Sequence, residues 1–219
     1  MDKSKLQLYF IAGTTNLGDR NLLDVLQAAL KGGITAFQLR EKGEGALQGD
    51  ALKTLAEQCK QLCNEYKVPF IVNDDVDLAI AVDADGVHIG QEDGDIAEVR
   101  KKIGSDKILG VSTHSVTDAM TASDAGANYV GVGPLFETAS KENAGTPVGP
   151  ELVRQVVNVL PGLPMVGIGG ITERKAGRVI REGASGVAVI SAIAHAKDVE
   201  QAARAMKGVI TLASTGVEM

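Results

Sequence analysis

Cationic and amide side chains alternate in the segment QLREK. Gln38, Arg40 and Lys42 point the same way if this segment is an extended strand, because side chains alternate between the two faces of a strand. Arginine offers a planar fork of N–H donors and lysine a compact charge, a pair of groups suited to phosphate or pyrophosphate. The alternative is a strand end whose charges are only solvated, and the position of this strand end in the fold decides between the two.

Carboxylates follow the next two apolar runs. Asp74 comes after FIVN and Asp93 after GVHI, so sequential strands would bring both to one edge of a sheet. Paired carboxylates beside a pyrophosphate site are typical of Mg²⁺, which takes one or two carboxylates together with phosphate oxygens and water. The alternative is helix capping, which we assign to Asp75 and Asp95 because each directly precedes a helical pattern. Spacing alone does not decide between metal binding and capping.

His114, in the segment STHS, is a candidate general acid or base because imidazole titrates near neutral pH. No partner carboxylate is evident in the sequence, so a polar loop residue is the favoured interpretation. His88 lies inside an apolar run and is expected to pack, whereas His195 is expected at the surface.

The longest connection covers residues 134–149 (PLFETASKENAGTPVG) and carries two hydroxyls and a cation at Thr138, Ser140 and Lys141. Long loops after a strand are commonly lids or ligand loops, with a plain surface loop as the alternative. Further along, Gly169 and Gly170 in GIGGI leave the backbone open to close approach by a ligand. Such a loop can cradle phosphate with backbone N–H groups.

Short apolar runs alternate with helical patterns, and these elements must position the polar segments. We expect strands at Gln7–Ala12, Ala36–Arg40, Pro69–Asn73, Gly86–Ile89, Ile108–Ser112, Tyr129–Gly133, Pro164–Ile168 and Gly186–Ile190. Apolar residues recur at helical spacing at Leu22–Leu30, Ala51–Tyr66, Asp75–Val82, Ile96–Ile103, Val116–Ala125, Pro150–Val159 and Arg174–Glu182, with a last helix from near Asp198.

Eight strand–helix units with short returns predict an α/β fold, a single (β/α)8 TIM barrel of parallel strands. An open doubly wound sheet is the alternative, but it needs a break in strand order that the even pattern does not indicate. In a barrel, every polar segment above lies at the carboxyl ends of the strands, where such folds place their chemistry. The sequence therefore predicts a cationic, metal-assisted site near the second to fourth strands and a monophosphate cradle at the seventh and eighth.

The composition disfavours several classes of protein. The net charge of −6 and the 3% aromatic content, with no Trp, disfavour nucleic-acid binding. No apolar run approaches the ~20 residues of a membrane span, and the first residues do not form a signal peptide, so we expect no membrane partner and a cytoplasmic location. Cys59 and Cys63 form no CxxC motif and are expected to be reduced. We expect one catalytic domain over residues 1–212 and a flexible tail over 213–219. The sequence leaves open whether the protein forms a homo-oligomer.

The motifs of residues 38–193, taken in order, resemble those of the thiamine phosphate synthase (thiamine-phosphate pyrophosphorylase) family. They are QLREK, ND after the third strand, HIGQED, GVSTHS, GVGPLFETASK, GIGGI and ISAI. The resemblance implies a TIM barrel that joins 4-amino-2-methyl-5-hydroxymethylpyrimidine pyrophosphate to a thiazole phosphate, giving thiamine phosphate and pyrophosphate. It implies two small phosphorylated substrates as partners and Mg²⁺ as the cofactor.

The resemblance also implies residue roles. Contacts to the pyrimidine pyrophosphate fall on Gln38, Arg40, Lys42, Asn73, Ser112 and Lys141, of which Arg40, Lys42, Ser112 and Lys141 form the catalytic set. Contacts to the thiazole phosphate fall on Thr138, Ser140, Gly170, Ile190 and Ser191, and the Mg²⁺ ligands are Asp74 and Asp93. The long loop departs from the FPTxTK common in the family, because Glu137 replaces proline and Ser140 replaces threonine. These changes alter the stiffness and charge of the loop and keep its hydroxyl donors.

The implied reaction is dissociative: pyrophosphate leaves the pyrimidine methylene carbon, and the thiazole nitrogen attacks the resulting carbocation. Such a reaction needs charge stabilisation on the leaving group rather than a nucleophile or a base. A thiazole tautomerase-like isomerase of the same barrel family is an alternative, and His114 is the feature that favours it. A sugar-phosphate isomerase or epimerase and a non-catalytic phosphate-ligand binding barrel are the others.

Overall fold

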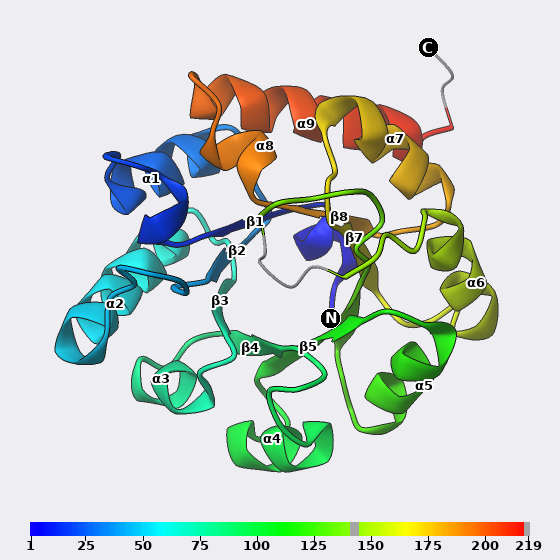
Figure 1. The fold of residues 1–219 in the computed structure, drawn as a ribbon, viewed down its shortest axis with the longest axis horizontal. Coiled ribbons are helices and arrows are strands. Elements are labelled where there is room, and N and C mark those ends of the chain that lie inside the picture. The colour runs from blue at the N-terminus through cyan, green and yellow to red at the C-terminus, as the bar shows by residue number, and fades with distance from the viewer. Residues whose placement is uncertain (141–144, 217–219) are drawn as a thin grey trace.

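Eight parallel strands close into a barrel (Figure 1). The computed structural model describes residues 1–140 and 145–216. The strands are β1 (Leu8–Ala12), β2 (Ala36–Leu39), β3 (Phe70–Asn73), β4 (Gly86–Ile89), β5 (Ile108–Thr113), β6 (Tyr129–Val132), β7 (Met165–Ile168) and β8 (Gly186–Val189). Strand β8 pairs with β1, with Val187 opposite Leu8. This closure confirms the predicted (β/α)8 barrel and excludes the open doubly wound sheet.

Helices surround the barrel and return the chain to the start of each next strand (Figure 1). They are α1 (Leu22–Lys31), α2 (Gly49–Glu65), α3 (Val76–Ala81), α4 (Ile96–Ile103), α5 (Val116–Asp124), α6 (Glu151–Val159), α7 (Glu173–Arg181), α8 (Ser191–Ala194) and α9 (Val199–Ser214). Short 3-10 helices, η1 (Lys3–Leu6) and η2 (Thr14–Asn16), flank β1. The predicted elements did not include α8. Helix α9 passes the expected boundary at residue 212 because Ala213 still packs on the core.

Two acidic residues fix where helices begin. Asp75 accepts a hydrogen bond from the Leu78 N–H at 2.8 Å, and Asp95 accepts one from the Glu98 N–H at 3.0 Å. Each carboxylate satisfies an N–H group that has no partner inside its helix. The capping roles predicted for Asp75 and Asp95 are confirmed.

The inside of the barrel holds a polar cluster among apolar side chains. Tyr9, Gln38, His88 and Tyr129 are all buried. Gly110 on β5 lies between His88 on β4 and Tyr129 on β6 in the strand register, and a Cβ at Gly110 would collide with both rings. The glycine therefore leaves room for His88 Nδ1 to contact Tyr129 Oη at 2.9 Å.

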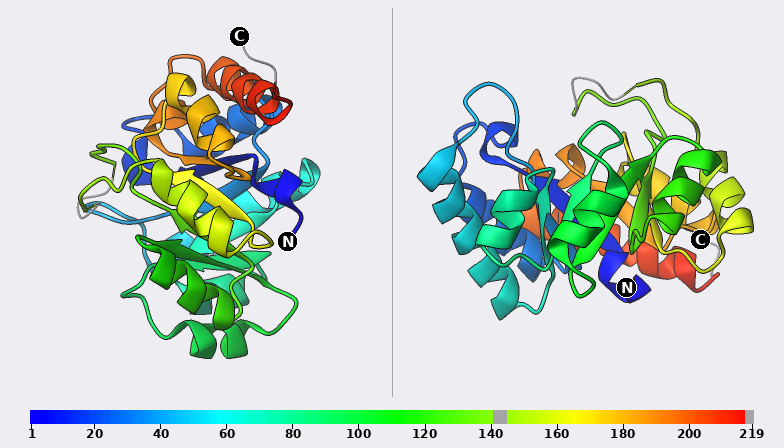
Figure 2. Two further views of the ribbon diagram at one scale, coloured as in Figure 1. Left: turned by 90° about the vertical axis from the view of Figure 1, so that its right-hand side faces the viewer. Right: turned by 90° about the horizontal axis from the view of Figure 1, so that it is seen from below.

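The two ends of the barrel differ. The loop after β6 projects from one end, and η1 with the N-terminus lies at the opposite end (Figure 2). The polar motifs that follow the strands are therefore gathered at the end away from the N-terminus.

The expectations for the cysteines and for His195 agree with the structure. Cys59 and Cys63 on α2 are buried and free, and His195 is exposed. Among the residues that the structure describes, no helix has the length and apolar character needed to cross a membrane.

We predict that Gly110→Ala lowers the free energy of unfolding by about 1–3 kcal/mol or more, because overpacking a filled interior forces neighbouring groups to move. Gly162→Ala is the matched control, because a Cβ at Gly162 meets nothing within 4 Å. Chemical denaturation of both variants measures the difference. Equal stabilities would show that the barrel interior adapts freely at Gly110.

Candidate active site

Two adjoining cavities lie at the carboxyl ends of the strands. The lining of the charged cavity includes Arg40, Lys42, Asn73, Asp74, His88 and Asp93. The lining of the second, glycine-lined cavity includes Thr138, Ile168, Gly169, Gly170, Ile190 and Ser191. Gly90, Ser112, His114 and Ser140 line both cavities and form a shared wall between them. The fold thus brings together two sites of different character, as the sequence predicts.

Arg40 and Lys42 reach the charged cavity from a loop, because β2 ends at Leu39 rather than continuing through them. Lys42 forms an ion pair with Asp74. The Lys42 side chain is 46% exposed and that of Asp74 18%, so the cation extends from solvent to a largely covered acid. Both cations line one cavity, although the strand alternation from which their convergence was predicted ends before them, and their role in binding an anion stays a prediction.

Asp74 is held by the turn that follows β3. Its φ of +60° lies in the left-handed region, which Asp adopts more readily than most residues. Its N–H donates to the His88 carbonyl at 2.8 Å, and Asn73 Nδ2 donates to its Oδ2 at 2.7 Å. Burial raises the pKa of the Asp74 carboxyl; the neighbouring Asp93 raises it further, and Lys42 acts in the opposite direction.

Asp74 and Asp93 line the same cavity, and Asp93 is one cause of the raised pKa of the Asp74 carboxyl. Asp93 also accepts a hydrogen bond from the Gly90 N–H at 2.7 Å, which fixes its side chain over the end of β4. Two adjacent acids repel when both are charged, and a divalent cation between them removes that repulsion. Within residues 1–140 and 145–216 no three His, Cys, Asp or Glu side chains form a metal-holding group. Mg²⁺ commonly takes one or two protein carboxylates and completes its shell with phosphate and water, so a pair of acids in a cavity suits this ion.

Gly169 and Gly170 allow two loops to pack closely. Their φ values are +92° and +62°, and a Cβ at either position would come within 3 Å of Pro134 or Phe136 in the loop after β6. The Phe136 N–H donates to the Gly169 carbonyl at 3.1 Å. The sequence predicted that these glycines open the backbone to a ligand, and the structure adds that they also seat the long loop.

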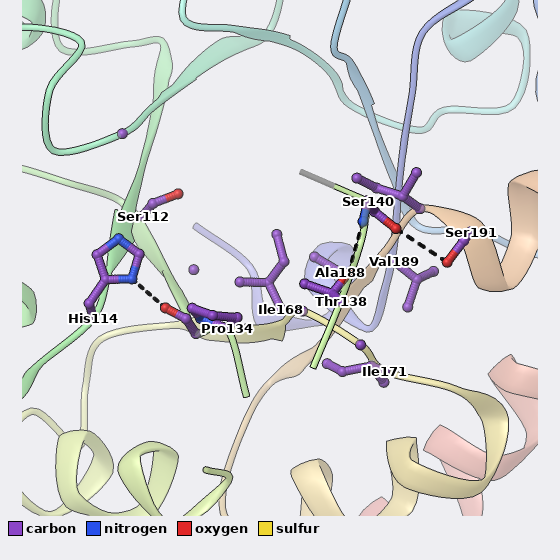
Figure 3. Close-up of a pocket in the computed structure, with 16 residues that line it drawn as sticks. Ser112, His114, Pro134, Thr138, Ser140, Ile168, Ile171, Ala188, Val189 and Ser191 are labelled. Atoms are coloured by element: carbon purple, nitrogen blue, oxygen red, sulfur yellow. Dashed lines mark hydrogen bonds between the residues drawn. The ribbon is translucent and has the colours of Figure 1, made fainter. Parts of the chain in front are cut away.

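Hydroxyl groups from distant strand ends meet in the glycine-lined cavity. Ser140 Oγ lies 3.4 Å from Ser191 Oγ, and the Ser140 N–H donates to Thr138 Oγ1 at 3.2 Å (Figure 3). Gly170 and Ile190 line the same cavity. All five residues that the resemblance assigns to the thiazole phosphate therefore lie around one space.

Ser112 and His114 stand on the shared wall, on the side of the cavity away from Ser191 (Figure 3). Ser112 Oγ contacts His88 Nε2 at 3.0 Å. His114 Nδ1 contacts the Gly133 carbonyl, and the Asp118 carboxylate bonds the His114 backbone N–H rather than its ring. In the described part of the chain, the carboxylate nearest in these contacts thus bonds the backbone of His114 and not its ring, in keeping with the polar-loop interpretation.

Two residues of the predicted set are placed differently from the rest. Gln38 is only 2% exposed, is not among the residues that line either cavity, and donates from Nε2 to Tyr9 Oη at 2.9 Å. It therefore does not converge with Arg40 at the mouth, because the barrel covers it. Lys141 lies outside the described residues.

Glu41 is a residue that sequence reasoning missed. Its carboxylate accepts hydrogen bonds from the Thr14 N–H at 2.8 Å and the Leu47 N–H at 3.0 Å, and from the Thr14 hydroxyl. These contacts tie the loop after β2 to the loop after β1. Glu41 thus anchors the segment that carries Arg40 and Lys42, and its position between two cations in QLREK was the only available signal.

We predict that Glu41→Gln lowers the free energy of unfolding by about 1–3 kcal/mol, because a half-buried amide N–H or hydroxyl loses a charged acceptor. It should also weaken binding of inorganic pyrophosphate, measured by calorimetric titration. Glu44→Gln is the matched control, because it removes the same charge from the same loop at an exposed position. Equal behaviour of the two variants would show that charge, not anchoring, is the role of Glu41.

Comparison with known proteins agrees with this geometry. The profile of the family described as thiamine monophosphate synthase matches residues 8–193. The thiamine-phosphate synthase of Geobacillus kaustophilus (strain HTA426) is 53% identical over 213 residues, covering 97% of this chain and 96% of the relative. That of Lysinibacillus sphaericus (strain C3-41) is 53% identical over 201 residues, covering 92% and 94%.

A solved structure is similar over the whole barrel. The thiamine phosphate pyrophosphorylase from Pyrococcus furiosus superimposes with a TM-score of 0.87 at 35% identity, covering 96% of this chain and 98% of that one. The relatives match almost the whole length of this chain, and the solved structure shares its fold. The chain belongs to the thiamine monophosphate synthase family.

Proposed function

We propose that this chain joins 4-amino-2-methyl-5-hydroxymethylpyrimidine pyrophosphate to a thiazole phosphate and releases thiamine phosphate and pyrophosphate. The observation that carries the proposal is the shared wall. A charged cavity and a glycine-lined cavity meet at Ser112, so two phosphorylated substrates can be held with their reacting atoms next to each other. Holding both partners together lowers the entropic barrier of a two-substrate reaction.

The charged cavity fits the leaving pyrophosphate. In the proposed step, the bond between the pyrimidine methylene carbon and the pyrophosphate oxygen breaks, and its electron pair leaves with the pyrophosphate. Arg40 and Lys42 stabilise the negative charge that develops there, and Ser112 donates a hydrogen bond. Mg²⁺ held by Asp74 and Asp93 would supply further positive charge to the leaving group.

The remaining pyrimidine contacts follow from the same arrangement. Asn73 lines the charged cavity beside Asp74, and Gln38 lies below it. We assign Asn73 to the pyrophosphate side, whereas Gln38 lines neither cavity and acts in the proposed site only through its hydrogen bond to Tyr9. Lys141 completes the cationic set by the family resemblance.

The glycine-lined cavity fits the second substrate. Thr138, Ser140 and Ser191 offer hydroxyls, and the backbone at Gly170 and Ile190 completes the cradle for a monophosphate. The thiazole nitrogen then attacks the methylene carbon with its lone pair, and no proton has to be removed. A thiazole isomerase would use the glycine-lined cavity alone, so the acid pair and the two cations of the charged cavity favour the synthase.

The test of the proposed function is a product assay with both substrates, run with Mg²⁺ and again with EDTA. We expect thiamine phosphate and pyrophosphate in equal amounts with Mg²⁺ and strong loss of both with EDTA. Absence of product from folded protein would overturn the proposal and favour the tautomerase-like isomerase, for which His114 is the next residue to substitute. Equal rates in EDTA would overturn the metal assignment alone.

We predict that Arg40→Ala and Asp93→Asn each lower kcat by about 10²–10³, because each removes one electrostatic contact to the leaving group or its metal. Steady-state assays at saturating Mg²⁺ measure the loss. Arg204→Ala is the control, because Arg204 lies on α9 and pairs with Glu200 there. Near-normal turnover in both site variants would refute this assignment of the charged cavity.

A further inference from the structure

We infer that a buried chain of hydrogen bonds beneath the shared wall fixes the Ser112 hydroxyl as a donor into the site. The chain runs in order through Gln38, Tyr9, Tyr129, His88 and Ser112. Tyr9, Tyr129 and His88 are then positioning residues, which act on the reaction through Ser112. What Ser112 does to the substrate rests on the proposed function, whereas the direction of the chain rests on the hydrogen bonds alone.

The chain is continuous, and its two phenols are closed off from solvent. Gln38 Nε2 lies 2.9 Å from Tyr9 Oη, and Tyr9 Oη lies 2.8 Å from Tyr129 Oη. Tyr129 Oη lies 2.9 Å from His88 Nδ1, and His88 Nε2 lies 3.0 Å from Ser112 Oγ. The two phenols are 1% and 0% exposed, so water does not compete for them.

The Gln38 amide group sets the direction in which the hydroxyls of the chain donate their protons. The Gln38 amide N–H donates to Tyr9, so the Tyr9 oxygen is an acceptor there and its single proton must find another partner. The Tyr129 oxygen is the other partner that the described structure gives it. If Tyr129 donated to Tyr9 instead, the Tyr9 proton would be buried without an acceptor, which is unfavourable because the desolvated donor forms no hydrogen bond.

The direction of the hydrogen bond between Tyr129 and His88 follows from the single proton that each phenol carries. Burial raises the pKa of both phenols, so each hydroxyl keeps one proton and no more. Tyr129 accepts from Tyr9 and therefore donates its own proton to His88 Nδ1. A neutral imidazole that accepts at Nδ1 carries its proton at Nε2. His88 therefore donates from Nε2 to Ser112 Oγ.

The result is a serine whose oxygen is already occupied as an acceptor by His88. Its own proton is left to point at a group in the cavities that Ser112 lines. A donor oriented before the reaction stabilises developing negative charge without having to turn, and water in its place would have to reorient. Gly110 makes the arrangement possible, because a side chain there would occupy the space between His88 and Tyr129.

The first test is ¹⁵N NMR of the histidine rings in the intact, substrate-free protein. We expect the His88 proton on Nε2 and an unprotonated Nδ1 in the native enzyme. In Tyr129→Phe, which deletes the donor to Nδ1, we expect this preference to weaken. A proton fixed on Nδ1 in the native protein, or an unchanged spectrum in Tyr129→Phe, would overturn the inferred direction.

The second test is a double-mutant cycle on the product assay. Tyr129→Phe should lower kcat about tenfold with little change in KM, because a misdirected donor loses part of its effect on the leaving group. In the Ser112→Ala background the same substitution should cause no further loss, since there is no hydroxyl left to direct. An equal loss in both backgrounds would mean that Tyr129 acts through packing and would refute the positioning role.

Tyr9→Phe is the matched variant for stability. It removes an equally buried hydroxyl on the other side of Tyr129, so both tyrosine variants should lower the unfolding temperature to a similar extent. The His88 proton should stay on Nε2 in Tyr9→Phe, because Nδ1 remains the acceptor for Tyr129; loss of this preference would contradict the chain. If the native enzyme formed no thiamine phosphate, the proposed function would fail, and the NMR test would still decide the direction of the chain.

Discussion

The pairing of β8 with β1 is the constraint on which the rest of the structure depends. Once the sheet closes, all carboxyl strand ends lie in one ring, and residues far apart in the sequence become neighbours. Ser140 meets Ser191 across two strand ends, and Lys42 reaches Asp74 from the loop after β2. Closure also creates an interior that side chains must fill, and Tyr9 and Tyr129 do so with ring centroids 5.9 Å apart.

Much of this arrangement could be predicted because it is encoded locally. The strands, the Asp75 and Asp95 caps and the glycine loop are all visible in short windows of sequence, since period, capping chemistry and backbone freedom act over a few residues. That Asp74 and Asp93 lie in one cavity could also be predicted, because each follows one of two sequential strands. The number and order of the strand–helix units were enough to place these groups at the same end of the barrel.

The remainder depends on register, which no short window contains. That Gln38 lies below the cavities rather than at their rim depends on how deeply β2 sits in the barrel. The contact between Tyr9 and Tyr129 joins residues 120 positions apart, and His88 reaches Tyr129 only because the register puts Gly110 between them. Glu41 was hidden for a related reason: its partner Thr14 belongs to another loop. Each of these contacts forms only when closure of the barrel brings its two residues together.

The two polar systems of the site differ in how they respond to a ligand. Lys42 and Asp74 form a partly exposed ion pair, and the acid pair crowds like charges together, so this side can rearrange when a cation and an anion arrive. The chain beneath Ser112 is buried, and each of its groups is held by the next, so it does not need to rearrange. A dissociative reaction suits this division. The incoming pyrophosphate needs counter-charge that adapts to it, whereas the short-lived cation needs surroundings that stay still and bring no water near it. In the proposed reaction, a fixed donor at Ser112, at the boundary between the cavities, stabilises the negative charge that develops on the leaving group without having to turn.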